Sequence, residues 1–144
     1  MTERKLLEIA ARVEQEPPSR ELDAEIAATT RRFYGQPVPT WFTNWDGELR
    51  AMPDGRVVAI QSDGREGPWL NASHYTTSLD AAASLMSEGW IVEIWISRKR
   101  DRAVCKARKY DAEWKLAAEF SATAPTEPQA RTAAALRAME AEGG

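Results

Sequence analysis

The chain's only histidine, His74, is the residue best suited to acid–base chemistry near neutral pH. A general base at this position would need an acid or a hydroxyl within hydrogen-bond reach, and Ser73, Tyr75 and Asp63 are the candidates in the sequence. The chain contains no Gly-x-Ser-x-Gly motif, and adjacency in sequence does not make Ser73 face the imidazole. An enzyme that uses His74 is therefore one hypothesis for the function.

Metal and thiol chemistry are not favoured by the composition. One histidine and one cysteine, Cys105, leave carboxylates as the only further ligands of a metal ion. A single cysteine also excludes a disulfide within the chain and fits a reducing compartment. We therefore expect no catalytic constellation, no metal ion and no cofactor.

Aromatic and basic side chains share the second face of a predicted sheet, namely Ile91, Trp95, Lys106, Arg108, Tyr110 and Lys115. The expected register places Trp95 opposite Lys106 and Glu93 opposite Arg108, which in turn faces Lys115. These residues could serve as cross-strand pairs that stabilise the sheet under a covering helix. The less favoured alternative is a patch on which Trp95 stacks and the basic side chains hold an anion.

A second aromatic group lies in the middle of the chain, comprising Trp41, Phe42, Trp45 and Trp69, with Arg50, Arg56 and Arg65 interleaved. Tryptophan with arginine is typical of protein interfaces and of sites that stack nucleotides. The same large rings could instead fill a small core whose loops offer few other apolar residues. A basic run at residues 97–102 is expected at a hairpin tip, where it is solvated or contacts an acidic partner.

Three strand-like runs would position the first group. Residues 90–97, 102–110 and 113–122 alternate between apolar and polar side chains, which predicts an antiparallel sheet with one buried face. A two-residue turn at Asp111-Ala112 would join the last two strands. The residues expected on the buried face are Val92, Ile94, Ile96, Ala103, Cys105, Ala107, Trp114, Leu116, Ala118 and Phe120.

Four helices are predicted around this sheet, near residues 3–15, 19–33, 78–87 and 126–141. The first carries an i, i+3, i+4, i+7 apolar stripe at Leu6, Ile9, Ala10 and Val13 and ends before Pro17-Pro18. Ser19 caps the second.

Capping patterns also mark the starts of the last two helices. Thr77 with Asp80 marks the start of the third, which accounts for Asp80 as a helix-terminal residue. Thr126 with Gln129 forms a capping-box pattern at the start of the fourth, and Pro128 suits its first turn.

The fold predicted from these elements is α+β, with the small antiparallel sheet sandwiched between helices in one domain over residues 1–144. Residues 34–73 interrupt it as a turn-rich aromatic insertion, in which 40–45, 48–52 and 56–61 resemble strands or extended loops. A net charge of −3 argues against broad DNA binding, which needs a strongly basic face. The charged N-terminus lacks a signal-peptide core, and no apolar run is long enough to cross a bilayer.

Several stretches resemble the small phage and prophage proteins of the α-β-α sandwich family. The matching positions are Leu22-Asp23-Ala24, Tyr75 to Ala82, Gly89-Trp90 and Ala134 to Ala138, within residues 19–30 and 74–141. The resemblance implies a sheet between helical layers and a phage or prophage origin. Together with the single cysteine and the absence of a signal-peptide pattern, it leads us to expect a location in the cytoplasm of the bacterial host. It implies no reaction, because the shared motifs are caps, turns and core positions.

Three functions remain as hypotheses. The first is a non-enzymatic accessory protein that binds or inhibits a host component, for instance in counter-defence. The second is a sponge that sequesters a small anionic ligand such as a signalling nucleotide. The third is the enzyme that uses His74. Trp95, Lys106, Arg108, Tyr110, Trp41, Trp45, Trp69 and His74 are the candidate binding residues, and a homo-oligomer is left open.

Overall fold

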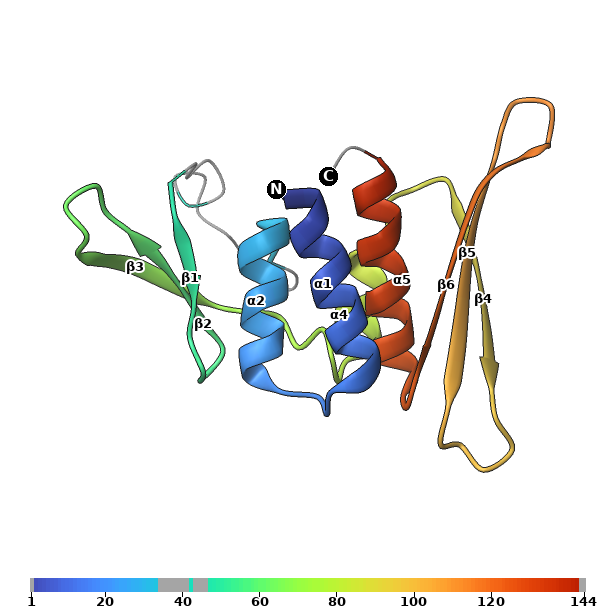
Figure 1. The fold of residues 1–144 in the computed structure, drawn as a ribbon, viewed down its shortest axis with the longest axis horizontal. Helices are drawn as coiled ribbons and strands as arrows, with labels where there is room; N and C mark the ends of the chain where they lie inside the picture. Colours follow the sequence, from blue (N-terminus) through green and yellow to red (C-terminus); the bar gives the residue numbers. More distant parts are fainter. Residues whose placement is uncertain (1, 34–41, 43–46, 143–144) are drawn as a thin grey trace. The chain divides into compact units, whose positions relative to one another are not determined.

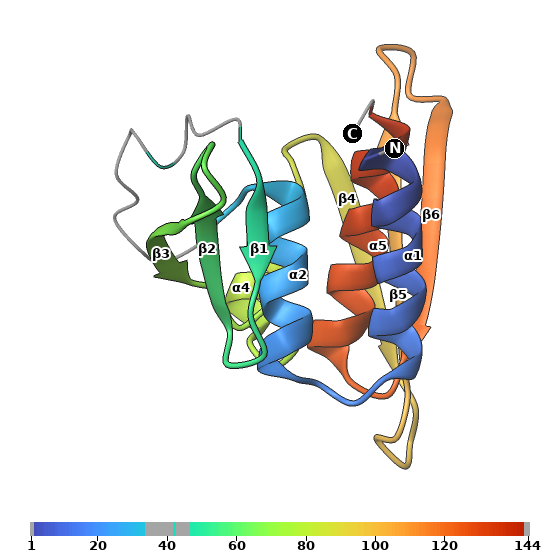
Figure 2. The same ribbon diagram turned by 60° about the vertical axis from the view of Figure 1, so that its left-hand side comes forward.

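The computed structural model describes residues 2–33, 42 and 47–142. The chain divides into two compact units, of which the first combines residues 1–18 with 75–144 and the second is Ser19–His74. Each unit is described by itself (Figures 1 and 2). The predicted α+β class is confirmed, because helices and antiparallel sheets form separate segments of the chain.

The first unit contains, in chain order, α1 (Thr2–Gln15), α4 (Leu79–Ser84), β4 (Trp90–Ile96), β5 (Ala103–Tyr110), β6 (Leu116–Ala124) and α5 (Glu127–Ala141). The strands form an antiparallel sheet of order β4-β5-β6, as the alternating pattern predicts. Figure 1 shows the three helices of this unit on one face of the sheet, with α5 between α1 and the strands. The opposite face carries no helix of this unit.

Small side chains allow α5 to approach the sheet closely. α5 packs on β5 and β6. Most of its residues are buried, and they include five alanines between Ala130 and Ala138. The facing strands also present small buried residues, namely Ala103, Cys105, Ala107, Ala122 and Ala124. On its other side α5 packs against α1, whose buried side chains are the predicted stripe of Leu6, Ile9, Ala10 and Val13.

Gln129 joins α5 to the C-terminal end of α1. Its backbone N–H donates to the hydroxyl of the N-cap Thr126 at 3.4 Å, so the predicted cap is confirmed. The wholly buried Gln129 side chain accepts from the Thr126 hydroxyl at 2.8 Å and donates to the carbonyls of Val13 and Glu16 at 3.0 and 2.8 Å. Because helix C-termini leave carbonyls without intrahelical partners, this amide satisfies groups that burial would otherwise penalise.

A half-buried ion pair occupies backbone groups on the free edge of β6. Arg137 on α5 donates to Glu14 on α1, and it also donates to the carbonyl of Ser121 at 3.0 Å. The Glu14 carboxylate accepts from the backbone N–H of Thr123 at 2.9 Å. Burial raises the pKa of Glu14, but the hydrogen bonds from Arg137 and Thr123 outweigh it and hold the pKa below its usual value. Two edge groups of β6 are therefore occupied by side chains of the same unit.

The loop between β5 and β6 is longer than the predicted two-residue turn. The carboxylate of Asp111 accepts from the amides of Glu113 and Lys115, both at 2.9 Å, and Trp114 adopts a φ of 62°. As a result β6 starts at Leu116, and Arg108 pairs with Glu119, so the predicted pairing with Lys115 is wrong.

The longer loop also changes which residues of this hairpin are buried. Trp114 is 79% exposed in the loop and Leu116 is exposed, so their predicted burial is wrong. The shift of partners is an even number of residues. The other strand residues therefore keep their predicted face, but Ile96 at the end of β4 is 49% exposed, so its predicted burial is also wrong.

The cap of α4 lies one residue later than predicted. Ser78, not Thr77, is the N-cap, and its hydroxyl accepts from the Ala81 amide at 3.2 Å. The buried face also differs from the expected one, because Ala81, Ala82 and Leu85 are buried whereas Leu79 is exposed.

The second unit pairs one helix with its own sheet. α2 (Arg20–Thr30) packs on β1 (Leu49–Ala51) and β2 (Arg56–Ile60), and β3 (Glu66–Asn71) completes the antiparallel order β1-β2-β3 (Figure 2). Ser19 caps α2 as predicted, accepting from the Leu22 amide at 3.0 Å. β1 and β2 lie in the segments predicted at 48–52 and 56–61, whereas β3 is absent from the sequence prediction.

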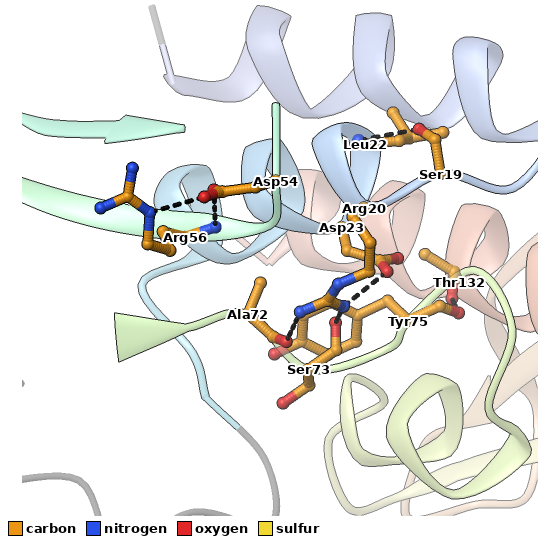
Figure 3. Close-up of polar contacts among 10 residues, drawn as sticks. All are labelled: Ser19, Arg20, Leu22, Asp23, Asp54, Arg56, Ala72, Ser73, Tyr75 and Thr132. Atoms are coloured by element: carbon orange, nitrogen blue, oxygen red, sulfur yellow. Dashed lines mark hydrogen bonds and ion pairs between the residues drawn. The ribbon is translucent and has the colours of Figure 1, made fainter. Parts of the chain in front are cut away.

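Arg20 fastens the start of α2 to the sheet end of the second unit. Its guanidinium donates to the carbonyl of Ala72 at 2.6 Å and to the buried carboxylate of Asp23 at 2.8 Å (Figure 3). It also lies against Gly55, where an added Cβ would meet the Arg20 Nε at 2.6 Å. Gly55 has a φ of +97°, so the turn favours glycine there, and an added Cβ would also displace the Arg20 guanidinium.

Replacement of Gln129 by alanine should destabilise the first unit by about 2 kcal/mol, because buried carbonyls of α1 lose their donor. The matched control is Gln15→Ala, which removes an exposed glutamine from α1 and should change stability by less than about 0.5 kcal/mol. Urea unfolding followed by circular dichroism measures both. Equal midpoints for the two variants would contradict the capping role.

Replacement of Arg20 by methionine should destabilise the second unit by about 2 kcal/mol, since buried Asp23 then loses a charged partner. The control is Arg65→Met, whose ion pair with Asp63 is exposed on both sides and should contribute less than about 1 kcal/mol. Limited proteolysis within residues 19–74 reports the local stability. The interpretation fails if both variants are cleaved at the wild-type rate.

Candidate functional site

The uncovered face of the β4–β6 sheet gathers the first group of candidate residues. Strand alternation and the observed register place on it Ile91, Glu93, Trp95, Val104, Lys106, Arg108, Tyr110, Glu119, Ser121 and Thr123. We call this set the open face. Because the helices of the first unit all lie on the other side (Figure 1), no element of that unit covers it.

Trp95 is the largest exposed apolar side chain of the open face. It is 47% exposed, and Ile91 on the same strand is also exposed. The Lys106 Nζ lies 5.2 Å from the centre of the Trp95 ring, which is a cation–π geometry. The residue directly opposite Trp95 is Val104, so the predicted pairing with Lys106 is wrong, and the two residues meet diagonally.

Arg108 occupies the middle of a charge ladder that crosses all three strands. Its guanidinium forms ion pairs with Glu93 on β4 and with Glu119 on β6, the latter at 2.5 Å. The hydrogen bond to Glu119 raises the pKa of Arg108, and the same bond lowers the pKa of Glu119. The residue opposite Glu93 is Lys106, so the pairing predicted for Glu93 with Arg108 is a diagonal contact instead. Two carboxylates thus already hold the guanidinium.

The remaining predicted residues lie apart from this ladder. Tyr110 ends the open face on β5 and is half-buried. Trp69 belongs to the second unit, where it lies on β3 and is 49% exposed under the guanidinium of Arg56, 5.4 Å from the ring centre. Trp41 and Trp45 lie outside the described residues.

His74 is exposed at the end of the second unit, and its imidazole makes no hydrogen bond or ion pair with any described residue. Asp63, considered as its acid, pairs with Arg65 instead. Ser73 is buried. The arrangement of described residues therefore supplies no acid or nucleophile poised on His74.

The thiol of Cys105 lies on the buried side of the sheet. Burial raises its pKa to about 11, while the charges of Arg131 and Glu127 act in opposite directions and are smaller effects. A thiol with such a pKa holds its proton at neutral pH and is a poor nucleophile. Within residues 2–33, 42 and 47–142, no three His, Cys, Asp or Glu side chains are placed to hold a metal ion.

The sequence analysis missed two features of this surface. Glu119 completes the charge ladder, and it would have been found had the β5–β6 loop been expected to run from Asp111 to Lys115. The second is the free edge of β4, a strand with a single charged residue, Glu93, among apolar side chains. The run of seven residues without proline was the available signal for an exposed edge.

The Cys105 thiol should resist modification in the folded protein. We expect reaction with an aromatic disulfide reagent at pH 8 to be at least about a hundredfold slower than in urea-unfolded protein, because burial both hides the sulfur and disfavours the thiolate. Absorbance of the released thiolate measures the rate. Equal rates in the two states would show an accessible thiol and would reopen a nucleophilic role for it.

Comparison of the chain with protein-family models, with curated proteins and with solved structures gives no significant match to any of them. Among the described residues, no helix combines the length and the apolar character needed to span a lipid bilayer.

Proposed function

We propose that the chain is a non-enzymatic accessory protein that binds a partner protein through the open face. The observation that supports this most is an uncovered sheet face on which Trp95 and Ile91 are exposed beside fixed charges. Aromatic and arginine side chains dominate binding energy at protein interfaces. A sheet also presents them with little loss of backbone freedom on binding.

The contacts within the open face hold its side chains in place before a partner arrives. Lys106 lies over the Trp95 ring, and Arg108 is fixed between two carboxylates on neighbouring strands. Ordering a long side chain at an interface costs about 0.5–1.5 kcal/mol. Side chains that are already ordered by their neighbours avoid part of that cost, so the open face is suited to specific binding.

The charge ladder favours a protein partner over a small anion. An anionic ligand at Arg108 would have to displace the carboxylates of Glu93 and Glu119, both of which already pair with the guanidinium. A protein surface can leave these pairs intact and contact Trp95 and Ile91 around them. The sponge hypothesis therefore ranks second.

The partner that we propose is a host protein in the bacterial cytoplasm, and inhibition of a defence component is one form of such binding. This part of the proposal rests on the resemblance of Leu22-Asp23-Ala24 and Tyr75 to Ala82 to phage and prophage proteins. The two carboxylates of the ladder are balanced by Arg108 and the neighbouring Lys106, which leaves the centre of the face without excess charge and is consistent with a protein target.

Replacement of Trp95 by alanine should weaken partner capture by about thirtyfold, the loss typical of a central aromatic at an interface. The matched control is Trp69→Ala, which removes a tryptophan of similar exposure that also lies under a cation, but in the second unit. Tagged wild-type and variant chains would be incubated with bacterial lysate, and bound proteins quantified by mass spectrometry. Circular dichroism confirms that both variants fold.

The outcomes separate the three hypotheses. A protein retained by wild type and Trp69→Ala, but lost by Trp95→Ala, supports the open face. Equal retention by all three chains would remove Trp95 from the interface. A small molecule released on unfolding in native mass spectrometry, with no protein bound, would favour the sponge. Turnover that is abolished by His74→Ala would replace binding by catalysis.

A further inference from the structure

The two free edges of the β4–β6 sheet are treated differently by the rest of the first unit. On β6, the ion pair of Glu14 with Arg137 occupies the N–H of Thr123 and the carbonyl of Ser121. On β4, the only described pairing partner is β5. An edge strand without a cover offers a row of N–H and C=O groups to another extended chain.

The hairpin register identifies which groups of β4 face outward. Ser97 donates its N–H to the carbonyl of Arg102 at 3.0 Å, so this pair is hydrogen-bonded across the hairpin. Hydrogen-bonded and non-bonded pairs alternate along an antiparallel ladder. The pairs two and four positions further along the ladder are therefore also hydrogen-bonded between β4 and β5. They are Trp95 with Val104 and Glu93 with Lys106. The intervening residues Val92, Ile94 and Ile96 direct their N–H and C=O groups away from β5.

The β6 edge leads to the same assignment independently. Thr123 and Ser121 give their backbone groups to Glu14 and Arg137, so these residues face away from β5. The residues opposite them on β5, Val104 and Lys106, must then direct their N–H and C=O groups toward β4 and hydrogen-bond to it. Both hairpins thus agree on the outward groups of β4.

The side chains of β4 would allow another strand to pair with its free edge. Its only charged residue, Glu93, has its carboxylate engaged by Arg108. α5 packs on β5 and β6, and Val92 and Ile94 are only half-buried while Ile96 is exposed. None of the usual devices that blunt an edge, such as proline or an outward lysine, is present between Trp90 and Ile96.

The charge around β4 indicates which kind of strand would bind at this edge. Residues 90–110 contain seven lysines and arginines but only two acidic residues, Glu93 and Asp101, within a chain whose net charge is −3. At the start of β4, Lys109 on β5 has its Nζ 5.6 Å from the centre of the Trp90 ring and also pairs with Glu142 at 3.4 Å, whereas the basic loop 98–102, with four cations and one carboxylate, follows the end of β4. A second copy added in parallel would bring two such basic loops together, whereas a strand with acidic residues beside loop 98–102 complements that end.

We propose that β4 binds an extended segment of a partner protein as a fourth strand of this sheet, and that acidic residues lie at the end of that segment beside loop 98–102. The inference rests on the proposed function, because the same partner would contact the open face through side chains and β4 through its backbone. Main-chain hydrogen bonds to Val92, Ile94 and Ile96 supply affinity, and the basic loop 98–102 at the end of β4 supplies selectivity.

The test uses two blocked nine-residue peptides with the whole chain. Each has a central alternation of valine and threonine, with two glutamates at each end in the probe and two lysines at each end in the control. We expect the glutamate peptide to bind at least about tenfold more tightly and to lose this advantage in high salt. Amide exchange measured by NMR should slow at Val92, Ile94 and Ile96. The amides of Glu93 and Trp95, already bonded to β5, serve as the internal reference.

A pair of variants at Ile94 distinguishes the contribution of its backbone N–H to peptide binding from the contribution of its side chain. Ile94→Pro removes an outward N–H and should weaken binding of the glutamate peptide by about tenfold, whereas Ile94→Thr keeps that N–H and should stay within about threefold of wild type. Circular dichroism establishes whether both variants fold. If Ile94→Pro does not fold, the exchange measurement on the wild-type chain decides alone.

Several results would overturn the inference. These are equal binding of both peptides, binding without slower exchange at Val92, Ile94 and Ile96, and self-association that protects those amides in the absence of peptide. The same holds for an oligonucleotide that binds the chain while neither peptide does. A partner protein captured through Trp95 with no protection of the β4 amides would leave the proposed function standing and remove strand addition alone.

Discussion

The burial of α5 on nearly all its sides is the constraint on which the first unit depends. A helix between a second helix and a sheet can be accommodated only if its side chains are small or apolar, and its alanines meet the small residues of β5 and β6. The polar groups on α5 must then find partners inside the protein. Gln129 does so at the end of α1, and the Thr132 hydroxyl donates to the carbonyl of Tyr75 at 2.8 Å.

The placement of α5 also determines where function can lie. Because α1, α4 and α5 share one face of the sheet (Figure 1), the other face is left to Trp95, Ile91 and the charge ladder. Charged pairs serve two purposes in this unit. Glu14 with Arg137 closes the β6 edge, whereas Glu93 and Glu119 hold Arg108 within the face. The asymmetry between a closed β6 edge and an uncovered β4 edge follows from this distribution of charge.

The second unit also buries a polar side chain, and an ion pair compensates for its burial. Asp23 lies on the same side of α2 as buried Ile26, where a carboxylate is costly without a cation. Arg20 supplies that charge three residues earlier and extends to the carbonyl of Ala72 (Figure 3). Within the Leu22-Asp23-Ala24 motif, the conformation around Asp23 thus has a structural reason, and no chemistry needs to be assigned to it.

Local pattern determined much of this protein without any tertiary information. The helical stripe from Leu6 to Val13, the caps at Ser19 and Thr126, and the three strands of the β4–β6 sheet all follow from spacing and from hydrogen bonds within a few residues. The choice of Trp95, Lys106, Arg108 and Tyr110 as neighbours on one face follows from strand alternation, which an even shift in register does not change.

Only the tertiary structure decided the partners of those residues. Register depends on loop length, and the Asp111 carboxylate builds a longer loop that brings Glu119 beside Arg108. The contacts of Gln129 with Val13 and of Arg20 with Ala72 join residues far apart in the chain, so no short window of sequence contains them. The packing of the helices likewise decides which face and which edge of the sheet remain uncovered. The alternation of residues along a strand does not distinguish them, because it is the same whichever side is covered.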